Sequence, residues 1–205
     1  MTGAELRVLL DRALELVATN EDELRDLDSA IGDGDLGITV SRGANAARQS
    51  MAALPPDSTP SEIIRAVATA IASANPSSFA ALVATGLLAA SQSVIGSRSV
   101  TNANAVTMAR QAIAAISKRG KAEIGDKTLL DALVPSVAAL EAAAPDGALA
   151  AMIGAARKGI DDTAASVSRK GRAAWLGERT IGHPDPGAMA YLRFLEALQE
   201  ATARP

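Results

Sequence analysis

Residues 27–37 read Leu27-Asp28-Ser29-Ala30-Ile31-Gly32-Asp33-Gly34-Asp35-Leu36-Gly37. Three aspartates, Asp28, Asp33 and Asp35, lie here among three glycines, between two segments whose apolar residues have helical spacing. Carboxylates this close together repel one another, and a shared cation relieves the repulsion. Oxygen ligands on a flexible backbone suit Mg²⁺ or Ca²⁺ far better than zinc or copper. The stretch therefore predicts a loop that holds a divalent metal.

The composition of the 205-residue chain favours a helical protein of one domain, residues 1–205. Hydrophobic residues make up 48% but aromatic residues only 2%, so the core must consist of Ala, Leu, Val and Ile, which favours helices. The formal net charge of −3 argues against a general nucleic-acid binder, which presents a basic face. Because the chain has no cysteine, a disulfide framework, a thiolate metal site and a thiol nucleophile are excluded.

Outside the acidic stretch, apolar spacing and capping signals predict eight helices joined mostly by short loops. The strongest start signal is Thr59-Pro60-Ser61-Glu62, with an N-cap threonine, a proline at the first helical position and a glutamate three residues after the cap. Short connections imply antiparallel neighbours, so we expect an all-α, up-and-down bundle of eight antiparallel helices. The expected helices cover about residues 3–20, 38–54, 60–74, 78–94, 102–118, 129 to the turn at 145–147, 148–169 and 186–201.

One stretch, residues 66–97, has no charged residue and is long enough on paper to span a bilayer. Asn75-Pro76-Ser77-Ser78 interrupts it, and Ala, Ser and Thr dilute its hydrophobicity. Two buried helices joined by a turn explain the stretch better. Since the chain also starts with a charged amphipathic segment and not with a signal peptide, we expect a cytoplasmic protein without a membrane span.

Three motif readings of the glycine-rich stretches fail on their context. Gly32–Gly37 has the spacing of a dinucleotide fingerprint, but no buried strand precedes it. A calcium EF-hand that starts at Asp33 would lack the glutamate at its twelfth position. Gly120–Thr128 nearly matches a P-loop, but Asp126 intervenes before the lysine and a helix precedes the loop. This last loop still feeds a helix N-terminus, which could contact an anion or a nucleotide edge.

Two further stretches could bind an anion. Ser77 and Ser78 open a helix, and its free N–H groups and dipole make a phosphate site, although an ordinary serine cap is the commoner role of such a residue in isolation. The long stretch at 171–188 holds the only Trp and the only His of the chain, together with arginines that could neutralise phosphate. Without an evident partner, His183 is read as structural.

Together these stretches resemble the nucleotide-binding L subunit, or C-terminal domain, of dihydroxyacetone kinases. The resemblance is carried by Leu27–Asp35, Ser41-Arg42-Gly43, Arg119–Thr128 and Gly171–Ala188, whose order and separation match that family along nearly the whole chain. It implies a barrel of eight antiparallel helices with ADP or ATP bound at one end. The chain would then be a kinase subunit that transfers a phosphoryl group to a short ketose or a related polyol.

The resemblance also implies roles for single residues. Asp28, Asp33 and Asp35 would hold two Mg²⁺ that bridge the nucleotide phosphates, and Ser77 and Ser78 would meet phosphate. The other implied nucleotide-binding residues are Gly37, Ile38, Thr39, Gly120, Leu129, Arg172, Asp185 and Pro186. No side chain is expected to act as acid, base or nucleophile, because phosphoryl transfer requires positioning and charge neutralisation more than protein nucleophiles.

The chain departs from the family pattern at three places. Leu36 stands where the family usually has a histidine, and Thr39 stands where an asparagine is common. Asn75-Pro76-Ser77-Ser78-Phe79 replaces a phosphate loop of the form Gly-Gly-x-Ser-Gly. Related kinases act on four-carbon ketoses and polyols, so these departures leave the substrate open.

The resemblance implies partners as well. In this family the sugar-binding histidine belongs to a separate K subunit or domain, so we expect the chain to dock a K-type substrate-binding subunit through its metal-bearing end. Two modes remain open, in which ATP is exchanged at each turnover or retained ADP is rephosphorylated by a phosphotransferase-system protein. A homodimer is also left open. The alternative functions are a regulatory or adaptor protein that keeps the nucleotide site without catalysis, and a calcium-binding module.

Overall fold

The computed structural model describes residues 1–203, and helices dominate this range. The only β contact among the described residues is an isolated bridge between Thr2 and Ser99. The predicted all-α fold is therefore confirmed. The helices are α1 (Gly3–Ala18), α2 (Glu21–Ile31), α3 (Leu36–Ala52), α4 (Pro60–Ala74), α5 (Ser78–Gln92), α6 (Asn102–Gly120), α7 (Leu129–Ala142), the 3₁₀ helix η1 (Pro145–Gly147), α8 (Ala148–Ala164), the 3₁₀ helix η2 (Ala173–Thr180) and α9 (Pro186–Ala203).

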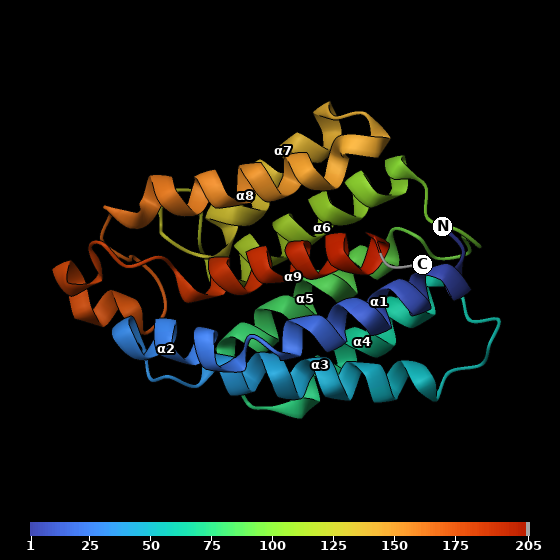
Figure 1. Cartoon of the computed structure of the whole chain (residues 1–205), viewed down its shortest axis with the longest axis horizontal. Coiled ribbons are helices and arrows are strands. Elements are labelled where there is room, and N and C mark those ends of the chain that lie inside the picture. Colours follow the sequence, from blue (N-terminus) through green and yellow to red (C-terminus); the bar gives the residue numbers. More distant parts are fainter. Residues whose placement is uncertain (204–205) are drawn as a thin grey trace.

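Eight of the nine described α-helices form a closed ring of neighbours. From α3 to α9 each helix packs on the next one in the chain, α1 packs on α3, and α9 packs back on α1. Successive helices of the ring run up and down, as short connections predict (Figure 1). Both chain ends lie at one end of the ring, and α2 lies at the other, where it contacts α3 and α9.

Helix α2, which is not part of the ring, corrects the prediction that residues 3–20 form one helix followed by a loop. The chain breaks at Thr19 and Asn20, and three acidic residues then occupy the first turn of α2, where negative charge is favourable. Leu24 and Ile31 are the buried residues of this short helix. Asp28 consequently lies on a helix and not in a loop.

The expected helix over 148–169 is also shorter in the structure, since α8 ends at Ala164. The connection from 165 to 185 is correspondingly longer than expected, and η2 lies inside it. At the other helix ends the prediction is within a few residues. α6, for example, continues to Gly120 because Lys121 ends it in a left-handed conformation.

Aliphatic and alanine side chains make up the core, as the composition predicts. The largest buried cluster lies among α1, α3, α4 and α9 and includes Leu14, Met51 and Ile63. A second cluster joins α7, α8 and α9 and includes Ile160 and Leu195. Small residues at the contacts let the helix backbones approach closely, so that many helices fit around one core.

Within residues 1–203, no helix combines the length and the apolar character that a membrane crossing requires. The uncharged stretch 66–97 instead forms the end of α4, a turn and the whole of α5. The predicted pair of helices joined by a turn is therefore confirmed.

Candidate functional site

Four connections between helices meet at the end of the ring that is remote from the termini (Figure 1). They are the acidic loop before α3, the turn before α5, the loop before α7 and the long segment before α9. Residues of all four line one pocket of about 970 Å³. Most of the predicted site residues belong to the lining. They are Asp28, Asp33, Asp35, Ser77, Ser78, Gly120, Leu129, Arg172, Asp185 and Pro186.

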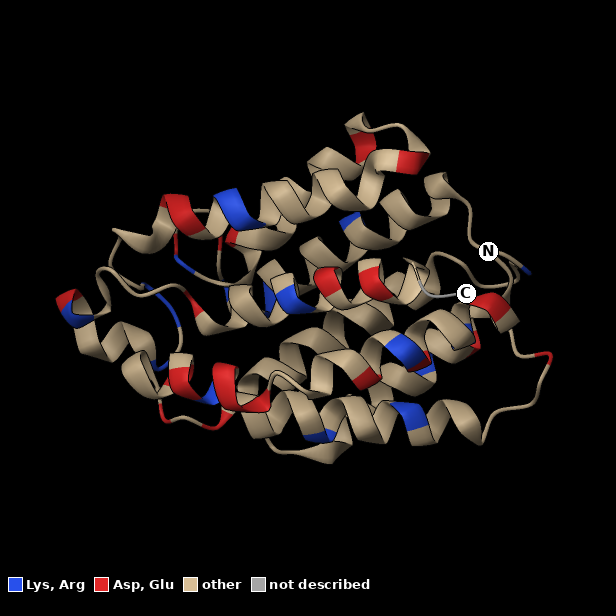
Figure 2. Ribbon diagram, in the orientation of Figure 1, with Lys and Arg blue, Asp and Glu red and all other residues tan. Residues whose placement is uncertain are grey.

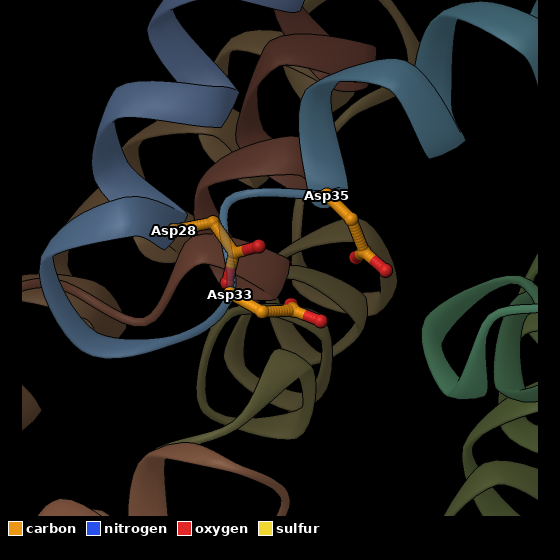
Figure 3. Close-up of side chains that lie close together, drawn as sticks. All are labelled: Asp28, Asp33 and Asp35. Atoms are coloured by element: carbon orange, nitrogen blue, oxygen red, sulfur yellow. The ribbon is translucent and has the colours of Figure 1, made fainter.

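The three predicted metal ligands converge at this pocket. Asp28 lies in the last turn of α2, Asp33 lies in the loop and Asp35 is the N-cap residue of α3. One carboxylate oxygen from each lies within 4.8 Å of the others, and Figure 3 shows the three side chains gathered around one space. Among the described residues, no other group of three or more His, Cys, Asp or Glu comes this close together. Three hard oxygen donors fit Mg²⁺ or Ca²⁺.

The glycines of the acidic loop allow this convergence. A Cβ atom on Gly32 would collide with Oδ1 of Asp28. Gly34 has a φ of 76°, which favours glycine. The N–H of Leu36 donates a hydrogen bond of 3.1 Å to Oδ2 of Asp28 and so ties the end of α2 to the start of α3. The glycines therefore serve the turn, and not the approach of a dinucleotide to the backbone.

The electrostatics of the cluster reflect its crowding. Burial, and then the negative charge of Asp28, raise the pKa of Asp35 above its ordinary value. The guanidinium of Arg172 opposes this crowding, because its Nη1 forms an ion pair with Asp33 and lies 3.4 Å from Oδ2 of Asp35. Figure 2 shows basic residues of the connecting segments at the same end as the acidic loop.

The start of α5 faces the pocket with Ser77 and Ser78. Ser77 is the N-cap residue, but its side chain makes no capping hydrogen bond. The side chain of Ser77 therefore does not act as an ordinary serine cap. The first N–H groups of a helix have no partner within it, so this helix start offers donors and a positive dipole end to an anion.

Three predicted residues, Gly37, Ile38 and Thr39, do not line the pocket. A Cβ atom on Gly37 would collide with the carbonyl oxygen of Glu21, so this glycine serves the packing of α3 on α2. Thr39 is buried, and its Oγ1 accepts a hydrogen bond of 2.7 Å from Nδ2 of Asn75. Because Asn75 ends α4 just before Pro76 and Ser77, Thr39 supports the turn before α5 from behind.

An apolar wall completes the pocket on the side of α5, α6 and α7. It is formed by Phe79, Leu82, Ile116 and Leu129, and Gly120 lies beside Leu82. Sequence reasoning finds only Gly120 and Leu129 of this wall. The other three have the apolar helical spacing of core residues, so nothing in the pattern separates a pocket wall from a core.

Trp175 is another residue of the pocket that sequence reasoning left without a role. It lies on η2 at the pocket, and 87% of its surface is exposed. His183 is exposed and lies outside the pocket lining. Its predicted lack of a role in the site agrees with this position.

The lysine of the P-loop-like stretch points into the protein. Nζ of Lys127 donates hydrogen bonds to the carbonyl oxygens of Ala164 at 2.9 Å, Ser166 at 2.8 Å and Thr180 at 2.6 Å. Burial lowers the pKa of Lys127, and the negative charge of Asp185 opposes that shift. Lys127 thus ties the loop before α7 to both ends of the segment that carries Arg172.

Asp185 caps α9 at the edge of the pocket. Its Oδ1 accepts a hydrogen bond of 2.7 Å from the N–H of Ala188. Burial raises the pKa of Asp185 to about 7, the hydrogen bond and Lys127 oppose the rise, and the negative charges of Asp131 and Asp28 add to it. A carboxyl group that changes charge near neutral pH therefore lies beside the acidic cluster.

A second hollow, of about 1070 Å³, lies among residues that include Thr2, Pro55, Thr59 and Arg98. None of the predicted site residues lines it. Size alone would not choose between the two hollows, but the carboxylate cluster, the helix start and the apolar wall all belong to the first.

A family model described as the DAK2 domain matches residues 30–200 of the chain. The chain belongs to the DAK2 domain family. The resemblance that the four sequence stretches carry is thereby confirmed, and the match covers all four connections around the pocket.

Several relatives of this DAK2 domain are named as kinases or as kinase subunits. The ADP-binding subunit DhaL of the PEP-dependent dihydroxyacetone kinase of Escherichia coli K12 is 31% identical over 194 residues, which are 92% of each chain. The ADP-binding subunit DhaL of the PTS-dependent dihydroxyacetone kinase of Lactococcus lactis is 32% identical over 193 residues, again 92% of each chain. The L-erythrulose 1-kinase of Mycolicibacterium smegmatis is 33% identical over 96% of this chain, which spans 35% of that protein. The DAK2 domain described here therefore belongs to a kinase family.

The fold of this DAK2 domain is shared with a solved structure. The crystal structure of the dihydroxyacetone kinase from C. freundii in complex with AMP-PNP and Mg²⁺ superposes with a TM-score of 0.77 and 24% sequence identity. The likeness covers 98% of this chain and 34% of that chain. It agrees with the all-α fold predicted from the sequence.

Proposed function

We propose that this DAK2 domain is the nucleotide-binding subunit of a dihydroxyacetone-type kinase. ADP or ATP binds with Mg²⁺ in the pocket at the loop end and takes part in phosphoryl transfer to a short ketose or a related polyol on a separate K-type subunit. The observation that carries the proposal is the convergence of Asp28, Asp33 and Asp35 on a pocket that also contains a helix N-terminus. Relatives of nearly the same length that are named ADP-binding kinase subunits support it.

The three aspartates would hold Mg²⁺, and the proposal includes two ions. When bound, the metal neutralises phosphate charge during the transfer. The carboxylates act as ligands in this proposal and not as acids or bases. The glycine turn and the hydrogen bond from Leu36 to Asp28 keep their oxygens together for that purpose.

The rest of the pocket would hold the nucleotide. The N–H groups at the start of α5, next to Ser77 and Ser78, are placed to donate to phosphate oxygens. The guanidinium of Arg172 lies at the same pocket and suits the fork-like recognition of phosphate. The apolar wall with Gly120 and Leu129 would receive the base, and Asp185 with Pro186 would close over the nucleotide.

The phosphoryl acceptor would come from the partner. The single histidine of the chain, His183, lies outside the pocket lining, so it is not placed to capture a ketone there. We therefore propose that a K-type subunit docks at the metal-bearing end. The relatives are named as PEP-dependent, PTS-dependent and L-erythrulose kinases, so the proposal includes both retained ADP and exchanged ATP. A homodimer of the chain stays a prediction.

Calorimetry with the full chain tests the nucleotide site. We expect ADP to bind only when Mg²⁺ is present, and Asp33→Asn to weaken this binding at least about tenfold, because the removal of a buried or ligating charge typically costs more than 1.4 kcal/mol. The matched control is Asp26→Asn, an exposed aspartate of α2 that pairs with Arg25 outside the pocket. Binding that is absent, or that is the same in the Asp33 variant, would contradict the proposal.

A second experiment tests the transfer. The chain is mixed with a K-type subunit, ATP and either dihydroxyacetone or erythrulose, and sugar phosphate is measured over many turnovers. Sustained formation of sugar phosphate excludes a purely regulatory role. Nucleotide binding without any sugar phosphate would favour the alternative of a regulatory or adaptor protein that has kept the site.

A further inference from the structure

Arg172 reaches the acidic cluster from the far part of the sequence. Its Nη1 forms an ion pair with Asp33 and lies 3.4 Å from Oδ2 of Asp35. These are two of the three carboxylates whose oxygens converge. About half of each of the three side chains is exposed, at 50% for Arg172, 46% for Asp33 and 39% for Asp35. The guanidinium therefore pairs with two of the carboxylates that a divalent cation would use.

A guanidinium and a divalent cation that bind the same carboxylates oppose each other, because two positive centres a few ångströms apart repel each other. Each also uses negative charge that would otherwise stabilise the other. We infer that Arg172 and a divalent cation compete for Asp33 and Asp35, and that an entering metal–nucleotide moves Arg172 from these carboxylates to the phosphates. This inference rests on the proposed function, because it deepens the account of the same pocket.

The segment 165–185, which carries Arg172, is open beside two glycines and anchored near its two ends. Gly171, with a φ of 66°, directly precedes Arg172, and Gly177, with a φ of 55°, follows within η2. No heavy atom beyond the neighbouring residues lies within 4 Å of the position of a Cβ on either glycine, so the space beside both glycines is open. In contrast, buried Lys127 holds Ala164 and Thr180 near the two ends of the segment.

The displaced guanidinium has one new anionic partner in the pocket. Once a metal takes up the charge of Asp33 and Asp35, the phosphates of the nucleotide offer Arg172 new negative partners that suit its fork of donors. A metal that enters alone breaks the ion pairs and gives Arg172 nothing in exchange. A metal that enters with a nucleotide also breaks these ion pairs, but the phosphates of the nucleotide then pair with Arg172. Competition therefore makes the binding of metal and nucleotide cooperative, with a coupling that is the same in both directions.

The test measures the affinity for Mn²⁺ without nucleotide, from the electron paramagnetic resonance signal of the free ion. We expect Arg172→Gln to bind Mn²⁺ about fivefold tighter than the wild-type chain, the factor for an ion pair worth about 1 kcal/mol. The same variant should bind ADP in the presence of Mn²⁺ more weakly than the wild type. A merely structural role of Arg172 would weaken both.

The matched control is Arg179→Gln, which removes the same charge from an exposed residue of η2 outside the pocket lining. We expect it to change neither affinity by more than about twofold, since an exposed charge at a distance is largely screened. Adding Asp33→Asn to Arg172→Gln should abolish the gain in Mn²⁺ affinity, because the ion then lacks a ligand.

The competition is contradicted if Arg172→Gln binds Mn²⁺ no tighter than the wild type, or if Arg179→Gln gains as much as Arg172→Gln. These outcomes differ from a failure of the proposed function. If the proposed function failed, ADP would not bind to the wild-type chain with any metal. The comparison of Mn²⁺ affinities would still report on Arg172.

Discussion

The carboxyl group of Asp185 gives the loop end a dependence on pH. Its pKa is raised to about 7, whereas an unfolded aspartate titrates near about 3.9. The folded chain thus holds this proton more tightly than the unfolded chain does. The contribution of Asp185 to stability is full below about pH 4 and is lost as the pH rises through about 7, at about 1.4 kcal/mol for each unit of pKa difference.

Asp185→Asn tests this directly. The amide cannot ionise, and its oxygen can still accept the hydrogen bond from Ala188. We therefore expect the free energy of unfolding of the variant, relative to the wild type, to increase between pH 5 and pH 8, as measured by urea denaturation. The control is Asp57→Asn, an exposed aspartate of the loop before α4. An equal difference between variant and wild type at both pH values would contradict the role assigned to Asp185.

Single residues of the site could be predicted where their chemistry is unusual. Three aspartates among glycines have no ordinary place in a helical core, so Asp28, Asp33 and Asp35 stand out in the sequence. Arg172 is assigned only through the family resemblance, because a single arginine in a polar loop is most often a solvated surface residue. Phe79 and its neighbours on the wall do not stand out, because a pocket wall and a core use the same apolar residues. Lys127 was missed as a support because its three partners are backbone carbonyls, which leave no trace in a sequence.

At the scale of elements, Lys127 joins two connections that are far apart in the chain. It is 1% exposed and makes three hydrogen bonds to carbonyl oxygens around the segment 165–185. This one side chain therefore fixes the base of the segment that carries Arg172 and Asp185.

We expect Lys127→Met to lower the free energy of unfolding by about 3 kcal/mol, because it removes three hydrogen bonds from a buried ammonium group to carbonyl oxygens. Urea denaturation measures this, with Lys118→Met on the exposed side of α6 as the control. Trypsin should also cleave the variant faster after Arg169 and Lys170. If the variant were as stable and as resistant as the Lys118 control, Lys127 would not anchor the segment.

Element boundaries could be predicted where capping signals are strong, as for α4 with its Thr59 cap and Pro60. The sequence does not separate helix α2, because this helix is short and rich in acidic residues, so that it and the acidic loop look like one polar stretch. The contact between Thr39 and Asn75 was also out of reach. Two residues that differ from the family pattern pair with each other, and no local pattern reports such a pair.

At the scale of the whole molecule, the up-and-down ring follows from short loops and brings alternate connections to the same end. This is why four stretches separated by up to about 150 residues form one pocket (Figure 1). This meeting point could be predicted, because short loops between antiparallel helices bring every second connection to the same end. The closure of α9 on α1 does not follow from loop length, and only the family resemblance implies it, as a barrel. The second hollow near the termini could not be predicted, because it depends on how the helices pack in three dimensions.

The central claim is that the loop end, and not the hollow near the termini, binds a nucleotide with its metal. The most direct measurement is a titration of the isotope-labelled full chain with ADP and Mg²⁺, followed by the amide chemical shifts. We expect saturable shifts centred on residues 28–36, 77–82, 119–130 and 170–187. Shifts centred on the hollow around Thr2, Thr59 and Arg98, or no saturable shifts, would contradict it.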